Sequence, residues 1–187
     1  LSAISKILHS NDATVPDLES EPRVLMLPLG GGNLKHGVGR NYLKALNKPE
    51  VHFYDRDEDA QKPKYRDEAS QVNARRPGSW AVITKNREAE NYLHADAIRE
   101  ALEIEVTFGP DDDVPLIVAK ALHAKNGSTK PWAEIEAAVD DLKERTSRAK
   151  TRLNRGAAAK MTIDRLKASD ADGEWESWLR KLGTMLK

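Results

Sequence analysis

Two short apolar runs separated by a helix-like segment constrain the fold of this chain more than any other feature. Residues 51–54 (VHFY) and 80–84 (WAVIT) are rich in aromatic and β-branched side chains, which is typical of buried strands. Residues 66–74, between them, have a helical pattern. A strand, a helix and a strand in this order predict two parallel strands joined by a crossover.

Further segments extend this alternation in both directions. The apolar run at 23–29 (RVLMLPL) predicts another buried strand, and 103–108 (EIEVTF) predicts a weaker one. Helices are expected at 1–8, at 34–46 with Asn33 as a candidate N-cap, and from Asn86 to Leu93. The fold class that follows is α/β, with a parallel, Rossmann-like sheet flanked by helices.

The character of the sequence changes after Pro110. Only helical patterns follow, at 114–125, 132–150, 156–161 and 162–168 and from Gly173 onward. We therefore divide the chain into an α/β domain at 1–110 and a helical appendage at 111–187. In the last helix, apolar side chains recur at helical spacing and predict a core stripe, with a homodimer contact as the alternative; they are Trp175, Trp178, Leu179, Leu182 and Leu186.

The composition narrows the class of protein. The chain has no Cys, which excludes disulfides, thiolate metal sites and thiol catalysis. Its five His residues lack zinc-ligand spacing. The net charge is 0, so nucleic-acid binding would need a local basic face. No apolar run approaches the ~20 residues that span a bilayer, and no secretory signal is visible. These features predict a cytoplasmic protein without a membrane partner.

An acidic run directly follows the first of the two strands. Asp55, Asp57 and Asp59 stand two residues apart. A strand that ends in carboxylates places them at the ligand crevice of a parallel sheet. Converging carboxylates form an oxygen-rich site suited to Mg²⁺ or Mn²⁺. A solvated acidic turn is the alternative, and the buried character of the preceding strand favours a site.

Two common motifs can be excluded. An EF-hand loop beginning at Asp55 would need Gly and Glu where Ala60 and Arg66 stand. A nucleotide-binding P-loop beginning at Gly32 would need Lys where Val38 stands. The glycine run at 30–32 is then most simply a tight turn between a strand and a helix.

Two polar segments are candidates for binding. Residues 87–94 (REAENYLH) could present one face to the strand-end crevice, and an exposed capping turn is the alternative. Residues 141–160 hold seven Lys and Arg against two acids, an excess that can follow a nucleic-acid backbone. A solvated basic helix is the alternative there. The candidate DNA contacts in this segment are Arg148, Lys150, Arg152 and Arg155.

Together these segments resemble a Toprim domain, and among Toprim proteins the OLD (overcoming lysogenization defect) family of ATP-dependent endonucleases. The resemblance rests on LPLGGGNLKH (27–36), HFYDRDED (52–59), ITKNREAENYLH (83–94) and MTIDRLKASDADGEWESWLRKLG (161–183). These segments occur in the family's order and cover most of the chain. The most specific feature is DRDED followed by REAENYL about 30 residues later.

The resemblance implies roles for individual residues. Asp55 and Asp57 match the family's DxD motif and would bind two Mg²⁺ or Mn²⁺ ions. Further metal ligands would come from Glu58, Asp59, Glu88 and Glu90. A basic side chain of the appendage, Lys150 or else Lys160, would neutralise charge on the scissile phosphate. The backbone close to the metal site would be that of Gly30, Gly31 and Gly32.

The implied function is that of a metal-dependent DNA endonuclease or nickase with a two-metal mechanism, in a family linked to phage defence. A non-catalytic Toprim scaffold and another Toprim phosphoryl-transfer enzyme are the alternatives. One departure matters, because Toprim domains begin with a Glu-bearing strand and nothing upstream of Gly30 matches it. We therefore expect the chain to belong to a longer polypeptide that holds this strand and an ATPase domain, where ATP would bind.

Overall fold

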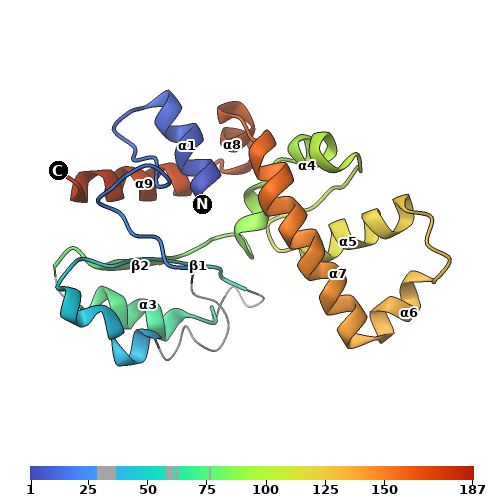
Figure 1. Ribbon diagram of the computed structural model, residues 1–187, viewed down its shortest axis with the longest axis horizontal. Coiled ribbons are helices and arrows are strands. Elements are labelled where there is room, and N and C mark those ends of the chain that lie inside the picture. The colour runs from blue at the N-terminus through green and yellow to red at the C-terminus, as the bar shows by residue number, and fades with distance from the viewer. Residues whose placement is uncertain (29–36, 58–60, 62, 76) are drawn as a thin grey trace.

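The structure is a computed structural model that describes residues 1–28, 37–57, 61, 63–75 and 77–187 (Figure 1). The first part of the chain holds two strands and short helices. In order, these elements are α1 (Ser2–Asn11), the 3₁₀ helix η1 (Tyr42–Leu46), β1 (Val51–Tyr54), α3 (Arg66–Asn73), β2 (Trp80–Ile83), the 3₁₀ helix η2 (Ala89–Tyr92) and α4 (Ala95–Leu102).

The remainder is helical. Its elements are α5 (Val114–Lys125), α6 (Trp132–Ala137), α7 (Val139–Arg152), the π-helical turn η3 (Leu153–Ala157), the 3₁₀ turn η4 (Ala158–Lys160), α8 (Ile163–Ser169) and α9 (Glu174–Met185). The chain is thus a mixed α/β protein. In the described part of the chain, no helix is both long enough and apolar enough to cross a lipid bilayer.

The predicted strand–helix–strand unit is confirmed. Strands β1 and β2 are parallel, with Val51 opposite Trp80 and Tyr54 opposite Ile83. Helix α3 connects them and covers one face of the sheet, where Val72 and Ala69 pack with Tyr54. The crossover thus forms where the alternation of apolar segments predicts it.

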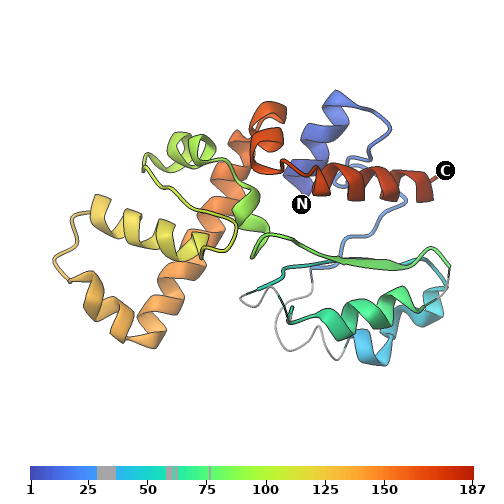
Figure 2. The ribbon, with the colours of Figure 1, turned by 180° about the vertical axis from the view of Figure 1, so that it is seen from behind.

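Helix α9 covers the opposite face of the sheet, so the sheet lies between α3 and α9 (Figures 1 and 2). The ring of Phe53 is stacked 5.9 Å from that of Trp175, and Trp80 and Trp178 complete the cluster. Trp175 is only 3% exposed. The prediction that the last helix carries a core stripe is therefore confirmed, but the stripe packs on the sheet and not within the helical appendage to which the sequence assigns this helix.

Two expected strands are wrong. Residues 24–28 form no regular element, and Leu25 is 75% exposed; Leu29, the last residue of the predicted run, lies outside the described residues. Residues 103–108 are also irregular. There Ile104 is buried and Val106 packs against the core, so the segment buries its apolar side chains without a backbone ladder. An apolar run becomes a strand only where a neighbouring strand supplies hydrogen-bond partners.

The helices differ from expectation mainly at their ends. The predicted helix at 114–125 is confirmed, whereas that at 132–150 is divided at Ala138, whose backbone is extended. Of the helix expected at 34–46, the N-cap and first residues lie outside the described residues. The described part is a helical turn at 37–40 and η1, separated by Asn41 with a φ of 48°. Asn tolerates this left-handed conformation, which interrupts the helix.

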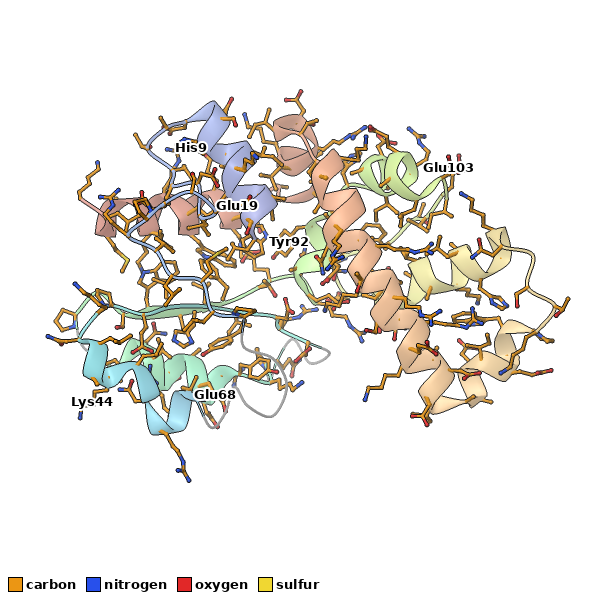
Figure 3. The ribbon with its side chains drawn as sticks, viewed as in Figure 1. His9, Glu19, Lys44, Glu68, Tyr92 and Glu103 are labelled. Carbon is orange, nitrogen blue, oxygen red and sulfur yellow. The ribbon has the colours of Figure 1, made fainter. Side chains whose placement is uncertain are left out.

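Tyr92 links the sheet region to the helical region (Figure 3). Its ring packs edge-on against Trp175. Its hydroxyl donates to the Glu174 carboxylate and accepts a hydrogen bond from the backbone N–H of Asn86. The residues after β2 are therefore attached to the start of α9, which positions the strand ends described next.

Candidate functional site

The ends of the two parallel strands are joined by three hydrogen bonds. The N–H of Arg56 donates to Oγ1 of Thr84 at 3.0 Å, and that of Asp57 donates to the carbonyl of Arg87 at 2.9 Å. The N–H of Ala89 donates to Oδ1 of Asp55 at 2.9 Å. The DRD sequence after β1 and the REAEN sequence after β2 thus form one structural unit, as their positions after parallel strands predict.

The REAEN segment is held by its own cap and by the loop before α5. Glu88, rather than the expected Asn86, is the N-cap of η2, and its N–H donates to Oδ1 of Asn91 at 3.1 Å. The amide of Asn91 donates to the carbonyls of Gly109 and Asp112 at 2.8 and 3.0 Å. The Glu88 side chain in turn accepts a hydrogen bond from the backbone N–H of Asn91. This reciprocal capping box fixes the direction of the Glu88 side chain.

Lys150, on α7, reaches the acids that follow β2. Its Nζ atom lies 2.9 Å from Oε2 of Glu88 and 3.4 Å from Oε2 of Glu90. The Glu90 side chain is 1% exposed, and its other oxygen accepts a hydrogen bond from Asn154 at 2.9 Å. The structure therefore brings together Glu88, Glu90 and Lys150, which the sequence resemblance groups in one site.

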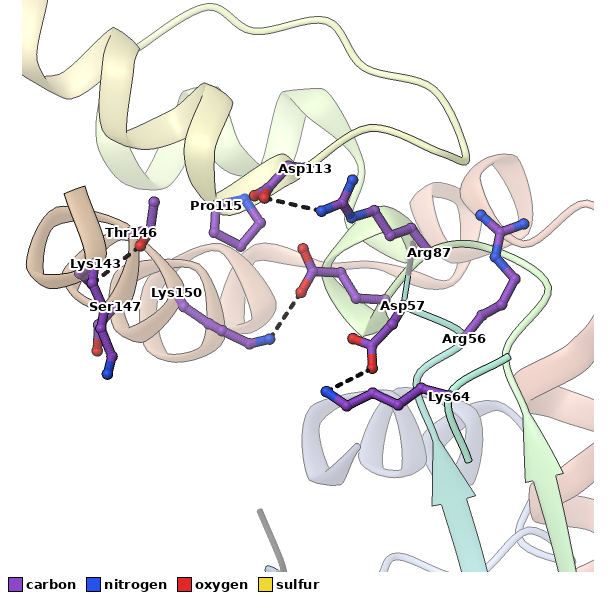
Figure 4. A pocket seen from close by; sticks show the side chains of 11 residues that line it. Arg56, Asp57, Lys64, Arg87, Asp113, Pro115, Lys143, Thr146, Ser147 and Lys150 are labelled. Atoms are coloured by element: carbon purple, nitrogen blue, oxygen red, sulfur yellow. Dashed lines mark hydrogen bonds and ion pairs between the residues drawn. The ribbon is translucent and has the colours of Figure 1, made fainter. Parts of the chain in front are cut away.

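Asp57 occupies an uncommon backbone conformation, with a φ of 61°. Its Oδ2 atom lies 3.2 Å from Nζ of Lys64 (Figure 4). A non-glycine residue in the left-handed region costs about 1–3 kcal/mol and is frequent at functional sites. The conformation turns the chain away from the strand direction immediately after Asp55.

Burial dominates the electrostatics of this cluster. It raises the pKa of Asp55, with the Lys150 charge acting in the opposite direction and Glu90 adding to the rise. Burial likewise raises the pKa of Glu88. Burial alone would lower the pKa of Lys150, but Glu90 and Glu88 outweigh it and the pKa is raised. One ammonium contacts the carboxylates of Glu88 and Glu90 and also acts on Asp55, so it is strongly held while these acids stay only partly compensated.

A cavity of about 700 Å³ opens beside this cluster (Figure 4). It lies between the strand ends and one side of α7. Its basic lining residues outnumber the acidic ones, which favours a negatively charged ligand. The lining residues are Arg56, Lys64, Arg87, Lys143 and Lys150, the acids Asp57, Glu88 and Asp113, and Pro115, Thr146 and Ser147.

The chain matches no protein-family model, no curated protein and no solved structure. The resemblance to Toprim and OLD-family proteins therefore rests on the sequence motifs alone.

Several predicted site residues lie elsewhere. Lys160 pairs with Glu100 on α4 at 3.2 Å and does not line the cavity. Arg148, Arg152 and Arg155 are exposed and are also absent from its lining. The predicted positions Gly30, Gly31, Gly32, Glu58 and Asp59 lie outside the described residues.

Sequence reasoning missed part of the cavity lining. Arg56 stands inside the DRD motif. Its position between two predicted metal ligands is the signal that could have identified it. Lys143, Ser147 and Lys150 are spaced by four and three residues, which is the spacing of one helix face. Asp113 is the N-cap of α5, whose N2 residue is Pro115; neither carried a signal of its own.

The carboxylates of the site can be compared with the ligands that a divalent cation needs. Among the residues that the structure describes, no three Asp, Glu or His side chains are grouped to hold a metal ion. Two buried carboxylate oxygens, Oδ2 of Asp57 and Oε2 of Glu90, each lie within 3.4 Å of a lysine ammonium. Carboxylate oxygens are the ligands that a hard cation prefers, and a divalent ion that bound here would take the place of the ammonium.

Proposed function

We propose that the chain is the catalytic domain of a metal-dependent DNA endonuclease that hydrolyses phosphodiester bonds. One observation carries the proposal. Glu88 and Glu90, which follow β2, contact Lys150 beside a cavity whose lining is rich in cations. The backbone of this segment is hydrogen-bonded to Asp55 and Asp57, which follow β1. The resemblance of the DRDED and REAENYL motifs to OLD-family Toprim domains supports the same activity. DNA, and an ATPase domain of the same polypeptide, are the partners that this proposal implies.

Each residue has a role in this proposal. Asp55, Asp57, Glu88 and Glu90 would hold Mg²⁺ or Mn²⁺. When bound, such ions lower the pKa of a water molecule and stabilise charge on a phosphodiester. Lys150 contributes a permanent positive charge at the same place, and Arg56 on the opposite side can orient a phosphate through its planar guanidinium.

The direct test compares DNA cleavage by the complete protein and by charge-neutral variants. Asp55→Asn and Asp57→Asn keep the size of the side chain and remove its charge. We expect each to reduce Mn²⁺-dependent cleavage by more than roughly 100-fold, as loss of a metal ligand does. Asp172→Asn is the matched control, since Asp172 is an exposed acid that pairs with Lys85 and does not line the cavity. Unchanged cleavage by both site variants would exclude the proposal.

A non-catalytic scaffold is the second candidate, and one observation favours it. The chain already neutralises its acids internally, through Lys150 on Glu88 and Lys64 on Asp57. Calorimetric titration with Mn²⁺ separates the two functions. Heat of binding that disappears in Asp55→Asn supports the nuclease, whereas absence of binding supports the scaffold. Product analysis with DNA and with a small phosphomonoester then distinguishes a nuclease from another phosphoryl-transfer enzyme.

A further inference from the structure

Helix α7 presents two basic faces of different character. Lys143, Thr146, Ser147 and Lys150 line the cavity (Figure 4). Arg148 and Arg152 are exposed and are not part of the lining, and Arg148 is paired with Glu144 one turn earlier. The basic excess that the sequence displays as one cluster is therefore divided by the helix into a cavity face and a solvent face.

Helix geometry explains this division. At 100° per residue, positions 143, 147 and 150 fall on one side of the helix, and position 148 is rotated by ~140° from position 143. Position 152 is rotated by ~180° from position 143, and Arg155 lies beyond the end of α7, in the π-helical turn η3. A ligand in the cavity would therefore meet the first set and not the second.

We propose that the cavity face of α7 is the track for the DNA backbone. Lys143, Ser147 and Lys150 contact phosphates of one strand, while Arg148, Arg152 and Arg155 make no contact. This inference rests on the proposed nuclease function and specifies where its substrate binds. It assigns binding to Lys143 and Ser147, and it removes three arginines from the set that the sequence suggests.

The ion pairs and hydrogen bonds of the lining side chains bear on which of them can bind a phosphate. No ion pair joins Lys143 to another described residue, so its ammonium is available to a phosphate. Lys150 differs, because its ammonium is held by Glu88 and Glu90, and a phosphate at this position would compete with them. The hydroxyl of Ser147 lies between the two lysines on the same face and can donate to a phosphate oxygen. The hydroxyl of Thr146 donates to the Leu142 carbonyl at 2.9 Å, so this residue lines the track without donating to a phosphate.

The opposite wall adds a buried cation. Arg56 is 9% exposed, and its Nε atom is buried without a hydrogen-bond partner among the described residues. Its terminal nitrogen pairs with Asp111, which is itself exposed. A buried guanidinium with an unused donor at a basic cavity is the arrangement that a phosphate oxygen completes.

The dimensions favour a polymer over a single phosphate. Seven residues of helix separate Lys143 from Lys150, a rise of ~10 Å. One strand of B-DNA advances ~3.4 Å along the helix axis per phosphate, but it also winds around that axis, so neighbouring phosphates lie farther apart in space than this rise. The two ammonium groups therefore match two different phosphates of one strand, one or two positions apart.

The salt dependence of DNA binding tests the track. Binding of a fluorescent duplex is measured by anisotropy in EDTA, so that cleavage does not interfere. We expect Lys143→Ala to reduce the slope of log affinity against log salt by about 1, because one fewer counterion is released. Arg148→Ala and Arg152→Ala remove the same charge from the same helix and should leave the slope unchanged.

The outcomes separate the inference from the proposed function. Equal slopes for Lys143→Ala and wild type, or an equal reduction in Arg148→Ala, would overturn the track while wild-type binding and cleavage leave the nuclease intact. A wild-type chain that binds no DNA at low salt would overturn both. Lys143 is exposed, so unchanged thermal unfolding of Lys143→Ala verifies that the variant is folded.

Discussion

The ammonium of Lys150 lies 2.9 Å from the carboxylate of Glu88, although 62 residues separate them in the chain. This contact joins helix α7 to the segment that follows β2. The Glu88 side chain is 14% exposed and that of Lys150 is 43% exposed, so the pair lies at the border of the cavity and not in the core. A substitution of Lys150 or Glu88 is therefore expected to affect both the stability of the fold and ligand binding in the cavity.

Lys150→Met should destabilise the fold, because it leaves the buried acids without their shared cation. We expect the free energy of unfolding in urea to fall by about 1 kcal/mol, since Lys150 remains partly in solvent. In a double-mutant cycle with Glu88→Gln, the two losses should not add. Lys143→Met, which breaks no ion pair, is the control. Additive losses in the cycle would contradict the pairing.

Trp175→Ala should cost about 3–5 kcal/mol of unfolding free energy, because the ring is buried between Phe53 and Tyr92. Trp175→Phe retains most of the apolar surface and should lose less. Leu46→Ala, at an exposed position, provides the control and should change stability little. Chemical denaturation followed by far-UV circular dichroism measures all three. A loss in Trp175→Ala no larger than in Leu46→Ala would exclude the packing described for α9.

Gly183→Ala should destabilise the chain even though Ala favours helices. A Cβ atom at position 183 would lie 2.5 Å from the carbonyl oxygen of Thr14 and 3.2 Å from Cδ of Pro16. Overpacking of this kind costs about 1–3 kcal/mol, which exceeds the gain in helix propensity of about 1 kcal/mol. The matched control is Gly156→Ala, whose Cβ would meet Ala101 at an ordinary 3.6 Å. Melting temperatures should fall in the first variant and not in the second.

Glu174 should make the fold less stable as pH rises. Burial is the largest cause of its raised pKa, with the Tyr92 hydroxyl acting in the opposite direction. A raised pKa means that the folded state holds the proton more tightly than the unfolded chain does. The contribution is therefore present below the ordinary value of 4.5 and is lost as pH rises through the folded value.

Glu174→Gln keeps the acceptor for Tyr92 and removes this titration. Between pH 4.5 and pH 7, the free energy of unfolding should therefore decline less in the variant than in wild type. Asp12 and Glu21, whose pKa values are lowered to about 2 by hydrogen bonds from Thr14 and from Arg23, act only at lower pH. Parallel pH profiles for the two proteins would disprove the role of Glu174.

The order of helices and strands along the chain could largely be predicted from the sequence, but which apolar segments pair with another strand could not. The unit of β1, α3 and β2 follows from alternation and spacing, and helix α5 from its helical pattern. The strands expected at 23–29 and 103–108 failed because a strand depends on a partner that local pattern does not specify.

The site was predictable to the same extent. Positions after parallel strands placed Asp55 near Glu88, since both strands end at the same edge of the sheet. The face of α7 that meets this edge depends on how the helix packs, and a cluster of Lys and Arg does not reveal it. For that reason Lys150 was found, whereas Lys143 and Ser147 were missed.

The position of α9 has a consequence for how the protein is made. Strand β2 ends at Ile83 and α9 begins at Glu174, so roughly 90 residues must be translated before the aromatic face of the sheet can be covered. At ribosomal speeds this takes roughly 5–20 s. During that interval Phe53 and Trp80 are exposed on the nascent chain, which makes this face a target for chaperones that bind aromatic segments.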